Sequence, residues 1–334
     1  MTRKPAATIY DVAQKAGVSI STVSRFLNTP KDVQAATGER IKAAMDELAY
    51  VRHGNAGTRQ NRQNARIGVL APFFPAPSFI DRIQGINEVF HRSSAELLMY
   101  SVDSPEQFDR YIRTGFFAKR LDGVIIMAMR LSDAHAEHLM AAGIRAVLIE
   151  QHHAAFNSIE CDNVRGGALA GEHLIRKGYA PCAYLGQDVP LPYSLNPSAL
   201  RLEGFARALA AGGAPLEERF LRLGEVSVAG GYAQAMELLA GGDRPRSIFA
   251  MSDLQAFGAV KAARRLGLRV PEDVAIIGFD DIEAADYMEL TTVSQELRES
   301  GRLAAELVLG QLLETGRPPR SIQLRASIVE RSTA

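Results

Sequence analysis

The strongest constraint on the fold is an alternation that starts at Ile67, where short apolar, β-branched runs are separated by stretches that are apolar on one helical face only. Buried strands that alternate with amphipathic helices are typical of a parallel, doubly wound sheet of the α/β class. The alternation continues for longer than one ordinary sheet needs. We therefore expect two similar lobes, with a crevice at the carboxyl ends of their strands. The expected strands are IGVLA, ELLMYSV, GVIIMA, AVLIE, CAYLG, SIFAM and VAIIGF, and the expected helices include Phe79–Phe90, Gly166–Lys177, Arg201–Ala211, Gly231–Leu239 and Leu254–Leu266.

The first 49 residues have a different pattern, which predicts three short helices and no strand. Thr8 is a candidate cap for a first helix, Ile9–Ala16, and Ser19 for a second helix that runs from Ile20 to about Asn28. We expect Thr37 to cap the third helix. The N-terminal part is therefore expected to be an all-α domain, separate from the lobes.

The first two helices have the arrangement of a helix-turn-helix. Gly17 permits a tight turn between them, and Val12 and Val23 give each helix an inward face. Such a pair is sometimes only a packing device. Here the second helix would expose short side chains that let its backbone approach DNA, followed by an arginine that can reach a guanine edge. The outward residues are Ile20, Ser21, Ser24 and Arg25.

Charge is unevenly distributed along a chain whose formal net charge is zero. Residues 1–65 hold ten Lys and Arg against five Asp and Glu, so the rest of the chain holds 28 against 33. A basic head on an acidic body suggests that the head meets a polyanion, although charge alone fits a solvated basic face as well. Residues 51–66, VRHGNAGTRQNRQNAR, contain almost nothing apolar and are expected to form a hinge or linker.

The segment TIYDVAQKAGVSISTVSRFLN, residues 8–28, resembles the head-piece of the LacI/GalR (lactose repressor) family almost without gaps. The resemblance covers essentially the whole chain, because later motifs follow in the family's order and spacing. It implies a DNA-binding transcriptional regulator, expected to be a repressor, whose operator affinity is controlled allosterically by a small sugar or sugar-like effector. These motifs are IGVLAP at 67–72, NVRGGALAGEHLIRKGY at 163–179, RLEGF at 201–205, SDLQAFGAVKAARRLGLRVPEDVAIIGFDD at 252–281 and LTTV at 290–293.

The resemblance also implies which head residues touch operator DNA. Ile20 and Ser21 match the family positions that select bases, and Arg25 matches a third base contact. Phosphate contacts set the register and base contacts set the sequence. Because Ile20 and Ser21 offer little hydrogen bonding, we expect Arg25 to supply much of the direct readout. Tyr10, Ser19, Thr22, Ser24 and Asn28 match positions that touch phosphate or sugar.

The hinge is where this chain departs from the family pattern. The family has a short helix there, whose leucine wedges into the minor groove, and Ala56 matches its alanine. Arg59 stands at the position of the wedge leucine, and an arginine does not unstack a base step as an apolar wedge does. Arginines instead enter narrow minor grooves, drawn by their negative potential. We therefore expect this protein to bend its operator less than its relatives do.

For the larger part of the chain, the resemblance implies a two-lobed core like the type I periplasmic binding proteins. We expect a head at 1–50, a hinge at 51–66 and an effector-binding and dimerisation domain at 67–334. Lobe 1 would hold about 67–163 and 294–320, and lobe 2 about 164–293 and 321–334. The expected effector contacts are Phe73, Phe79, Glu150, Tyr193, Arg201, Ser252 and Asp280.

These effector residues have a coherent chemistry. Carboxylates and guanidinium groups suit vicinal sugar hydroxyls, which form paired hydrogen bonds, and an aromatic ring suits the apolar face of a sugar. Ordinary packing in the core or between the lobes remains an alternative for Phe73, Phe74 and Phe79. For the carboxylate of Asp281 we favour a role as a helix cap over one in ligand binding.

Other classes of function find less support. His152 and His153 are adjacent and have no third ligand at metal spacing, and neither a catalytic constellation nor a nucleotide-binding fingerprint occurs, so we expect no metal, no cofactor and no enzyme. A solute-binding protein of a sugar transporter is the main alternative, but no signal peptide and no membrane segment are seen. We therefore expect a cytoplasmic protein. It should form a homodimer, because one head reads only a half-site.

Overall fold

The structure, a computed structural model, describes residues 9–29, 32–48, 65–72, 74–113, 120–188, 194–314 and 316–334. The chain divides into two compact units, Met1–Gln63 and Asn64–Ala334. We call the first unit the head and the second the effector domain.

The head is a three-helix unit around a small apolar core. Its helices are α1 (Ile9–Ala16), α2 (Ile20–Asn28) and α3 (Ala35–Glu47). Gly17, at φ 65°, makes the turn between α1 and α2 that the sequence predicted. Val12, Val23 and Ile41 from the three helices are fully buried together.

The caps of these helices follow the prediction at one position and not at another. The Ser19 side chain accepts a hydrogen bond from the Thr22 amide and caps α2, as expected. The predicted cap at Thr37 is wrong, because α3 already begins at Ala35, after Gln34, which makes no side-chain cap hydrogen bond. Thr37 therefore lies inside the first turn of α3.

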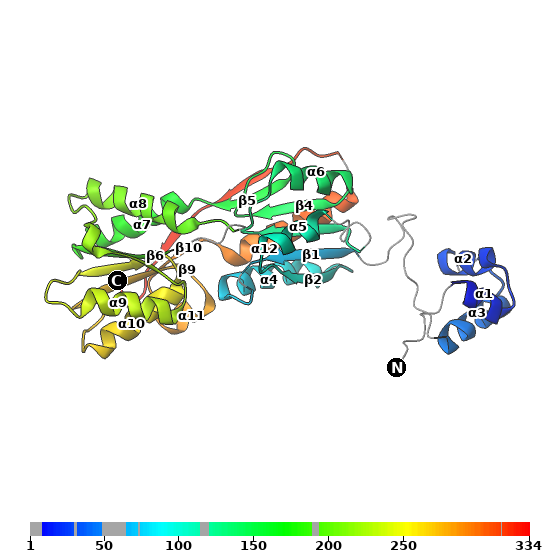
Figure 1. Ribbon diagram of the computed structural model, residues 1–334, viewed down its shortest axis with the longest axis horizontal. Coiled ribbons are helices and arrows are strands. Elements are labelled where there is room, and N and C mark those ends of the chain that lie inside the picture. Colours follow the sequence, from blue (N-terminus) through cyan, green and yellow to red (C-terminus); the bar gives the residue numbers. More distant parts are fainter. Residues whose placement is uncertain are drawn as a thin grey trace. The chain divides into compact units, whose positions relative to one another are not determined.

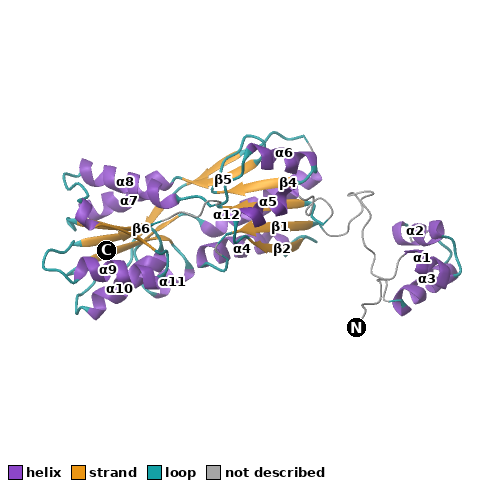
Figure 2. Ribbon diagram, in the orientation of Figure 1, coloured by secondary structure: helices purple, strands orange, loops and turns teal. Residues whose placement is uncertain are grey.

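The effector domain contains two six-stranded sheets with helices on both faces (Figures 1 and 2). The first lobe has strand order β11-β5-β4-β3-β1-β2, and all of its pairings are parallel. Helices α5 and α6 pack on one face of this sheet, and α4 and α12 on the other. Its elements are β1 (Arg66–Ala71), α4 (Pro77–Phe90), β2 (Glu96–Ser101), α5 (Pro105–Arg113), β3 (Gly123–Met127), α6 (Asp133–Ala141), β4 (Arg145–Ile149), β5 (Asn157–Cys161), α12 (Leu297–Leu313) and β11 (Ser321–Leu324).

The second lobe repeats this plan with strand order β12-β10-β9-β8-β6-β7. Its strands are parallel except for β12, which pairs antiparallel with β10. Helices α7 and α8 pack on one face, and α9 and α10 on the other, as Figure 1 shows. Its elements are α7 (Asn163–Arg176), β6 (Cys182–Gln187), α8 (Pro197–Ala211), the 3₁₀ helix η3 (Glu218–Phe220), β7 (Leu221–Gly224), α9 (Val228–Leu239), β8 (Ser247–Ala250), α10 (Asp253–Arg265), β9 (Ala275–Asp280), α11 (Glu283–Tyr287), β10 (Thr292–Ser294) and β12 (Ser327–Val329).

The chain passes between the lobes three times, and the last crossing lies later than predicted. We expected residues 321–334 to belong to the second lobe. Strand β11 instead pairs with β5 of the first lobe, with Ile322 opposite Ile159, and only β12 joins the second sheet. The crossing therefore lies at residues 325–326.

Helices α4 and α12 approach each other so closely that glycines are required at their crossing. A Cβ at Gly301 would lie 1.9 Å from the backbone oxygen of Arg82, and one at Gly85 would lie 1.9 Å from that of Arg298. Real Cβ atoms essentially never come within 3.0 Å of such an atom. The glycines thus fix the position of α4 against α12. Helix α4 carries Phe79 and Arg82, which line the cavity between the lobes.

Candidate functional site

The exposed face of α2 presents the residues predicted to read bases. Ile20 is 41% exposed although it is a large apolar residue, while Val23 on the opposite face is fully buried. Ser21 and Arg25 are exposed as well. An exposed isoleucine next to a serine and an arginine forms a surface with one apolar contact, one hydroxyl and one guanidinium, which suits the major groove.

Three hydroxyl groups gather where α2 begins. The Ser19 hydroxyl lies 2.7 Å from that of Ser21 and 2.8 Å from that of Thr22. The N-terminus of a helix favours anions, because its backbone amides point outward and its dipole is positive there. This cluster is therefore a suitable place for a DNA phosphate.

The other predicted DNA contacts are distributed around the head or lie outside the described residues. Tyr10 on α1 is 67% exposed, and Ser24 is half-buried on α2. The side chain of Asn28 lies outside the described residues, as do Ala56 and Arg59 of the expected hinge.

In the effector domain, a cavity of about 160 Å³ lies between the two lobes, at the carboxyl ends of their strands. Apolar side chains such as Leu195, Val226 and Met251 form much of its wall. Five predicted effector residues line it: Phe79, Glu150, Arg201, Ser252 and Asp280. Residues 73 and 189–193 lie outside the described ranges, and these include Phe73 and Tyr193.

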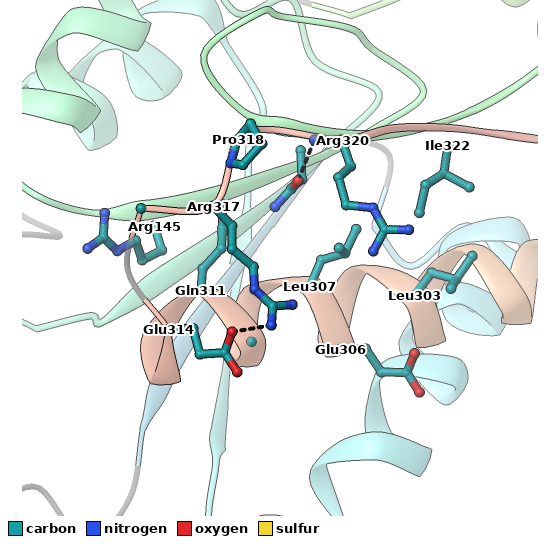
Figure 3. A pocket seen from close by; sticks show the side chains of 13 residues that line it. Arg145, Leu303, Glu306, Leu307, Gln311, Glu314, Arg317, Pro318, Arg320 and Ile322 are labelled. Carbon is teal, nitrogen blue, oxygen red and sulfur yellow. Dashed lines mark hydrogen bonds and ion pairs between the residues drawn. The ribbon is translucent and has the colours of Figure 1, made fainter.

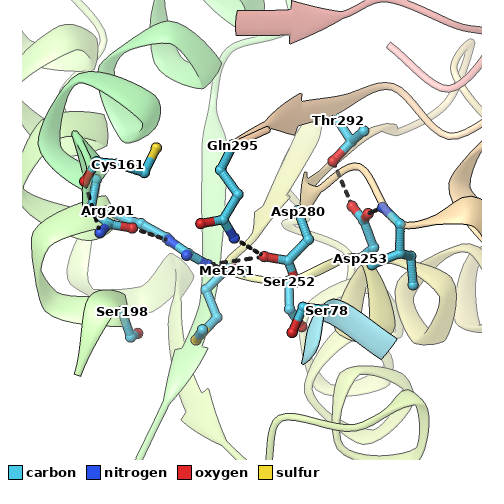
Figure 4. A network of polar contacts seen from close by, with 12 residues as sticks. Ser78, Cys161, Ser198, Arg201, Met251, Ser252, Asp253, Asp280, Thr292 and Gln295 are labelled. Atoms are coloured by element: carbon cyan, nitrogen blue, oxygen red, sulfur yellow. Dashed lines mark hydrogen bonds and ion pairs between the residues drawn. The ribbon is translucent and has the colours of Figure 1, made fainter. Parts of the chain in front are cut away.

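A chain of polar contacts crosses this cavity from one lobe to the other. Arg82 on α4 pairs with Glu150, which follows β4, and the Arg82 Nη2 atom also lies 3.3 Å from Gln295 Oε1. Gln295 Nε2 donates to Asp280 Oδ1 at 2.5 Å, and Arg201 Nη1 lies 3.8 Å from the same oxygen (Figure 4). Each lobe therefore supplies one guanidinium and one carboxylate, and Gln295 connects the two pairs.

Arg201 is held rigidly by the second lobe. Its Nε donates to Asn163 Oδ1 at 2.8 Å and its Nη1 donates to the Met251 carbonyl at 2.5 Å. The guanidinium carbon lies 3.6 Å from the centre of the Phe279 ring. Because the side chain is only 3% exposed and anchored on three sides, it presents its remaining donors in a fixed direction.

Burial raises the pKa of Asp280, although the guanidinium groups of Arg201 and Arg82 act in the opposite direction. Burial and the nearby Asp280 carboxylate likewise raise the pKa of Asp253, which lies behind the cavity. Asp253 accepts hydrogen bonds from the Thr292 hydroxyl at 2.5 Å and the Ile282 amide at 3.0 Å (Figure 4). The site thus holds carboxyl groups that are easier to protonate than usual.

Some residues behave differently from the sequence-based interpretation. Asp281 does not cap a helix, since Ile282 precedes α11 and Asp281 forms an ion pair with Arg331 at 2.9 Å. Phe74 is 38% exposed and does not line the cavity. Arg82 and Gln295 were missed, and only the position of Arg82, three residues after Phe79 on the same helical face, offered a signal.

The two lobes also touch at the rim of the cavity. The Leu195 amide donates to the Ala128 carbonyl at 3.1 Å, and Arg130 Nε donates to the Ser194 carbonyl at 3.1 Å. These bonds join the end of β3 in the first lobe to the segment before α8 in the second. A ligand between the lobes would thus affect contacts that set their relative position.

A larger cavity of about 280 Å³ lies in the first lobe, between α12 and the amino ends of β4 and β5 (Figure 3). Arg317 there pairs with Glu314. None of the predicted effector residues lines this cavity, so its greater volume does not make it the better effector site. The cavity between the lobes is preferred because charged groups of both lobes converge on it.

Within the described ranges, no group of three or more His, Cys, Asp and Glu side chains could hold a metal ion. No described helix is both long and apolar enough to cross a membrane. His153, considered above as a possible metal ligand, contacts Asp133 Oδ1 at 3.2 Å.

Comparison with known proteins supplies the relatives of both units. Residues 8–53 match the family of bacterial regulatory proteins called the lacI family, and residues 172–334 match a periplasmic binding protein-like domain. The transcriptional repressor PurR of Erwinia tasmaniensis is 31% identical over 332 residues, which cover 97% of this chain and 96% of that protein. The ribose operon repressor of Escherichia coli is 29% identical and covers 98% and 100%.

Solved structures agree with these sequence relatives. The lac repressor dimer bound to operator and an anti-inducer has a TM-score of 0.74 at 29% identity, over 99% of both chains. A lacI-family regulator from Silicibacter pomeroyi has a TM-score of 0.82 at 27% identity, over 98% of this chain and 99% of that one. The expected fold and the expected class of DNA-binding transcriptional regulator are confirmed, and the transporter alternative is not supported. The chain belongs to the lacI family of bacterial regulatory proteins.

Proposed function

We propose that this protein is a repressor that binds operator DNA as a dimer. Its affinity for the operator changes when a small sugar-like molecule binds between its lobes. The observation that carries the proposal is the polar chain across the cavity, in which Arg82 and Glu150 of one lobe face Arg201 and Asp280 of the other. A ligand held by both pairs would fix the relative position of the lobes. As a DNA-binding regulator of bacterial type, the protein would work in the cytoplasm, where the chromosome is.

The size and chemistry of the cavity support a ligand with several hydroxyl groups. Its volume of about 160 Å³ is below the roughly 300–1,000 Å³ of pockets for drug-sized ligands, which suits one sugar ring. Carboxylates accept from sugar hydroxyls and guanidinium groups donate to them. A lacI-family regulator from Enterococcus faecium was solved with bound ribose, at 28% identity and a TM-score of 0.70 over 80% of this chain and 98% of that one.

Operator binding with and without sugars tests this function. We expect one of a panel of pentoses and hexoses to change the affinity of the full-length protein for its operator in a gel-shift assay. Arg201→Ala should abolish that response, while operator binding in the absence of sugar stays near normal. The variant should lose roughly 1–3 kcal/mol of effector-binding free energy, because it leaves buried polar partners unpaired. If Arg201→Ala left the response intact, the effector would not bind in this cavity.

The structure also suggests where the second copy docks. A groove of about 530 Å³ crosses from the first lobe to the second and is lined by Pro77 and Ile80 of α4, Leu254 and Phe257 of α10, and Tyr287 of α11. Tyr287 is 79% exposed, which is unusual for a large aromatic side chain unless a partner covers it. A second copy of this chain is the occupant that paired operator half-sites require.

Sedimentation of two arginine variants tests the docking face. Tyr287→Arg places a charge in the groove and should shift the protein toward monomer and weaken operator binding. Leu313→Arg is the matched control, because Leu313 is 85% exposed on α12 and does not line the groove. Equal behaviour of the two variants would show that the dimer forms through another surface.

A further inference from the structure

Arg82 is a second guanidinium in the cleft and is only partly satisfied by the protein. Its side chain is 4% exposed. Its Nη2 pairs with Glu150 and approaches Gln295, and its Nη1 makes a long contact of 3.3 Å to the Ser78 carbonyl. Its buried Nε meets no hydrogen-bond acceptor among the described residues. Buried donors of a charged group are expensive to leave unpaired, so a missing acceptor points to something that the chain itself does not supply.

The charge balance of the cavity points the same way. Arg82 and Arg201 stay protonated under all ordinary conditions. They face Glu150 and Asp280, and burial makes the Asp280 carboxyl easier to protonate than usual. With both carboxyls ionised the charges of the lining balance, and when Asp280 takes up a proton one positive charge is left over. A ligand with one negative charge would compensate that charge, whereas a neutral sugar would not.

We propose that the effector of this protein is a sugar acid, a polyhydroxylated molecule of monosaccharide size with one carboxylate, which the Arg82 guanidinium binds. This inference rests on the proposed function, since it assumes that the effector occupies the cavity between the lobes. Planar, paired recognition of a carboxylate is the geometry that a guanidinium favours. Arg201 and Asp280 then take the hydroxyl groups from the side of the second lobe.

The surroundings of Arg82 fit this role. Phe79, one helical turn earlier on α4, lies with its ring centre 5.7 Å from the guanidinium carbon and lines the same cavity. It leaves an apolar wall beside the charge, against which the carbon backbone of a sugar acid can lie. Gln295 joins Arg82 to Asp280 across the lobes, and a ligand that bonds to both would replace this link with its own.

A structural role for Arg82 is the competing explanation, because its pair with Glu150 ties α4 to the end of β4. In that case the residue would affect folding and all ligands alike. The two explanations separate when acidic and neutral ligands are compared on the same variants.

Calorimetry on the full-length protein provides the test. The probes are gluconate, glucuronate and ribonate, each paired with glucose or ribose as its neutral counterpart, and glucose 6-phosphate. We expect a sugar acid to bind at least tenfold more tightly than its neutral counterpart. Arg82→Gln should reduce that acid's affinity by about tenfold or more, as expected for a charged hydrogen bond, and reduce the neutral sugar's affinity by a clearly smaller factor. Arg82→Lys, which keeps the charge, should retain part of the preference.

Arg298→Gln is the matched control, because Arg298 lies on α12, is 60% exposed and contacts Glu88 and Gln84 of α4 without lining the cavity. It should leave the preference unchanged. A neutral sugar or the phosphate ester binding more tightly than every acid would overturn the proposal, and so would equal losses for acid and neutral ligands in Arg82→Gln. If instead Arg201→Ala changed no ligand's affinity, the proposed location of the effector would be wrong, which is a separate result.

Discussion

The crossing of α4 and α12 allows a sharp test of how the cleft is built. Gly301→Ala would add a Cβ 1.9 Å from the backbone oxygen of Arg82, and such contacts need at least 3.0 Å. The helices would therefore have to separate by at least 1.1 Å. Because the clashing atom belongs to the backbone of α4, no side-chain rotation can relieve the contact. The residue that would move is Arg82, which lines the cavity between the lobes.

The expected magnitude follows from two opposing effects. Overpacking usually costs about 1–3 kcal/mol, and a rigid backbone contact puts this site at the upper end. Replacing a helical glycine with alanine returns roughly 1 kcal/mol. The net loss in free energy of unfolding should be about 2 kcal/mol, or several degrees in melting temperature at roughly 2–4 °C per kcal/mol.

Gly310→Ala supplies the control from the same helix. A Cβ at Gly310 meets nothing within 4 Å, so this variant should gain up to about 1 kcal/mol. Urea unfolding followed by circular dichroism measures both changes, and calorimetry measures effector affinity, which only Gly301→Ala should weaken. Equal or greater stability of Gly301→Ala relative to the wild type would refute this account of the helix crossing.

Three further predictions concern the head, the cleft and the hinge. Arg25→Ala should lower operator affinity at least tenfold in a gel shift and leave effector affinity unchanged, since one bidentate base contact is worth roughly 1–3 kcal/mol and is lost twice in a dimer. Burial raises the pKa of Asp280 above 3.8, and the nearby Glu150 carboxylate raises it too, while Arg201 and Arg82 act in the opposite direction. The Asp280 carboxyl therefore binds its proton more tightly in the folded protein than in the unfolded chain. The protein's free energy of unfolding should therefore fall as the pH rises from about 4 toward neutrality, and Asp280→Asn should flatten this slope in urea titrations. Arg59→Leu should increase operator bending in a circular-permutation gel, and strong bending by the wild type would contradict the expected role of Arg59.

Much of the fold followed from the sequence because periodicity marks buried faces. The expected strands from IGVLA to VAIIGF all appear, but several helices begin earlier than predicted. Helices α7, α9 and α10 start at caps made by Asp162, Ser227 and Ser252, whose side chains accept from amides in the first turn. Polar caps and glycine-rich first turns carry no apolar period, so periodicity places the helix start too late. The pairing of β11 was missed because Ser321–Leu324 is short and alternately exposed.

The site was harder to predict than the fold, for a physical reason. Sequence motifs located Arg201 and Asp280 because these residues stand in recognisable segments. Gln295 lies in a crossing between the lobes, and its role depends on how close Arg82 and Asp280 come in space. Arg82 belongs to an amphipathic helix in which a polar residue normally faces solvent. Its place three residues after Phe79 puts it on the same helical face as that residue, but its burial follows from the position of α4 against α12.

The backbone has an unusual conformation at three residues of the cavity, which come from both lobes. Ala128, Glu150 and Asp280 have φ values of 50°, 68° and 125°, and all three line the cavity. Such conformations cost non-glycine residues about 1–3 kcal/mol each and persist where the surroundings hold them in place. At Glu150 and Asp280 they end a strand and bring a carboxylate to the cavity, and at Ala128 they set the carbonyl that bonds Leu195 of the other lobe. The Ala128 amide also donates to the carbonyl of Ile149, the residue before Glu150, at 2.9 Å. A ligand that shifts Glu150 should therefore also shift the contact between the lobes at Ala128.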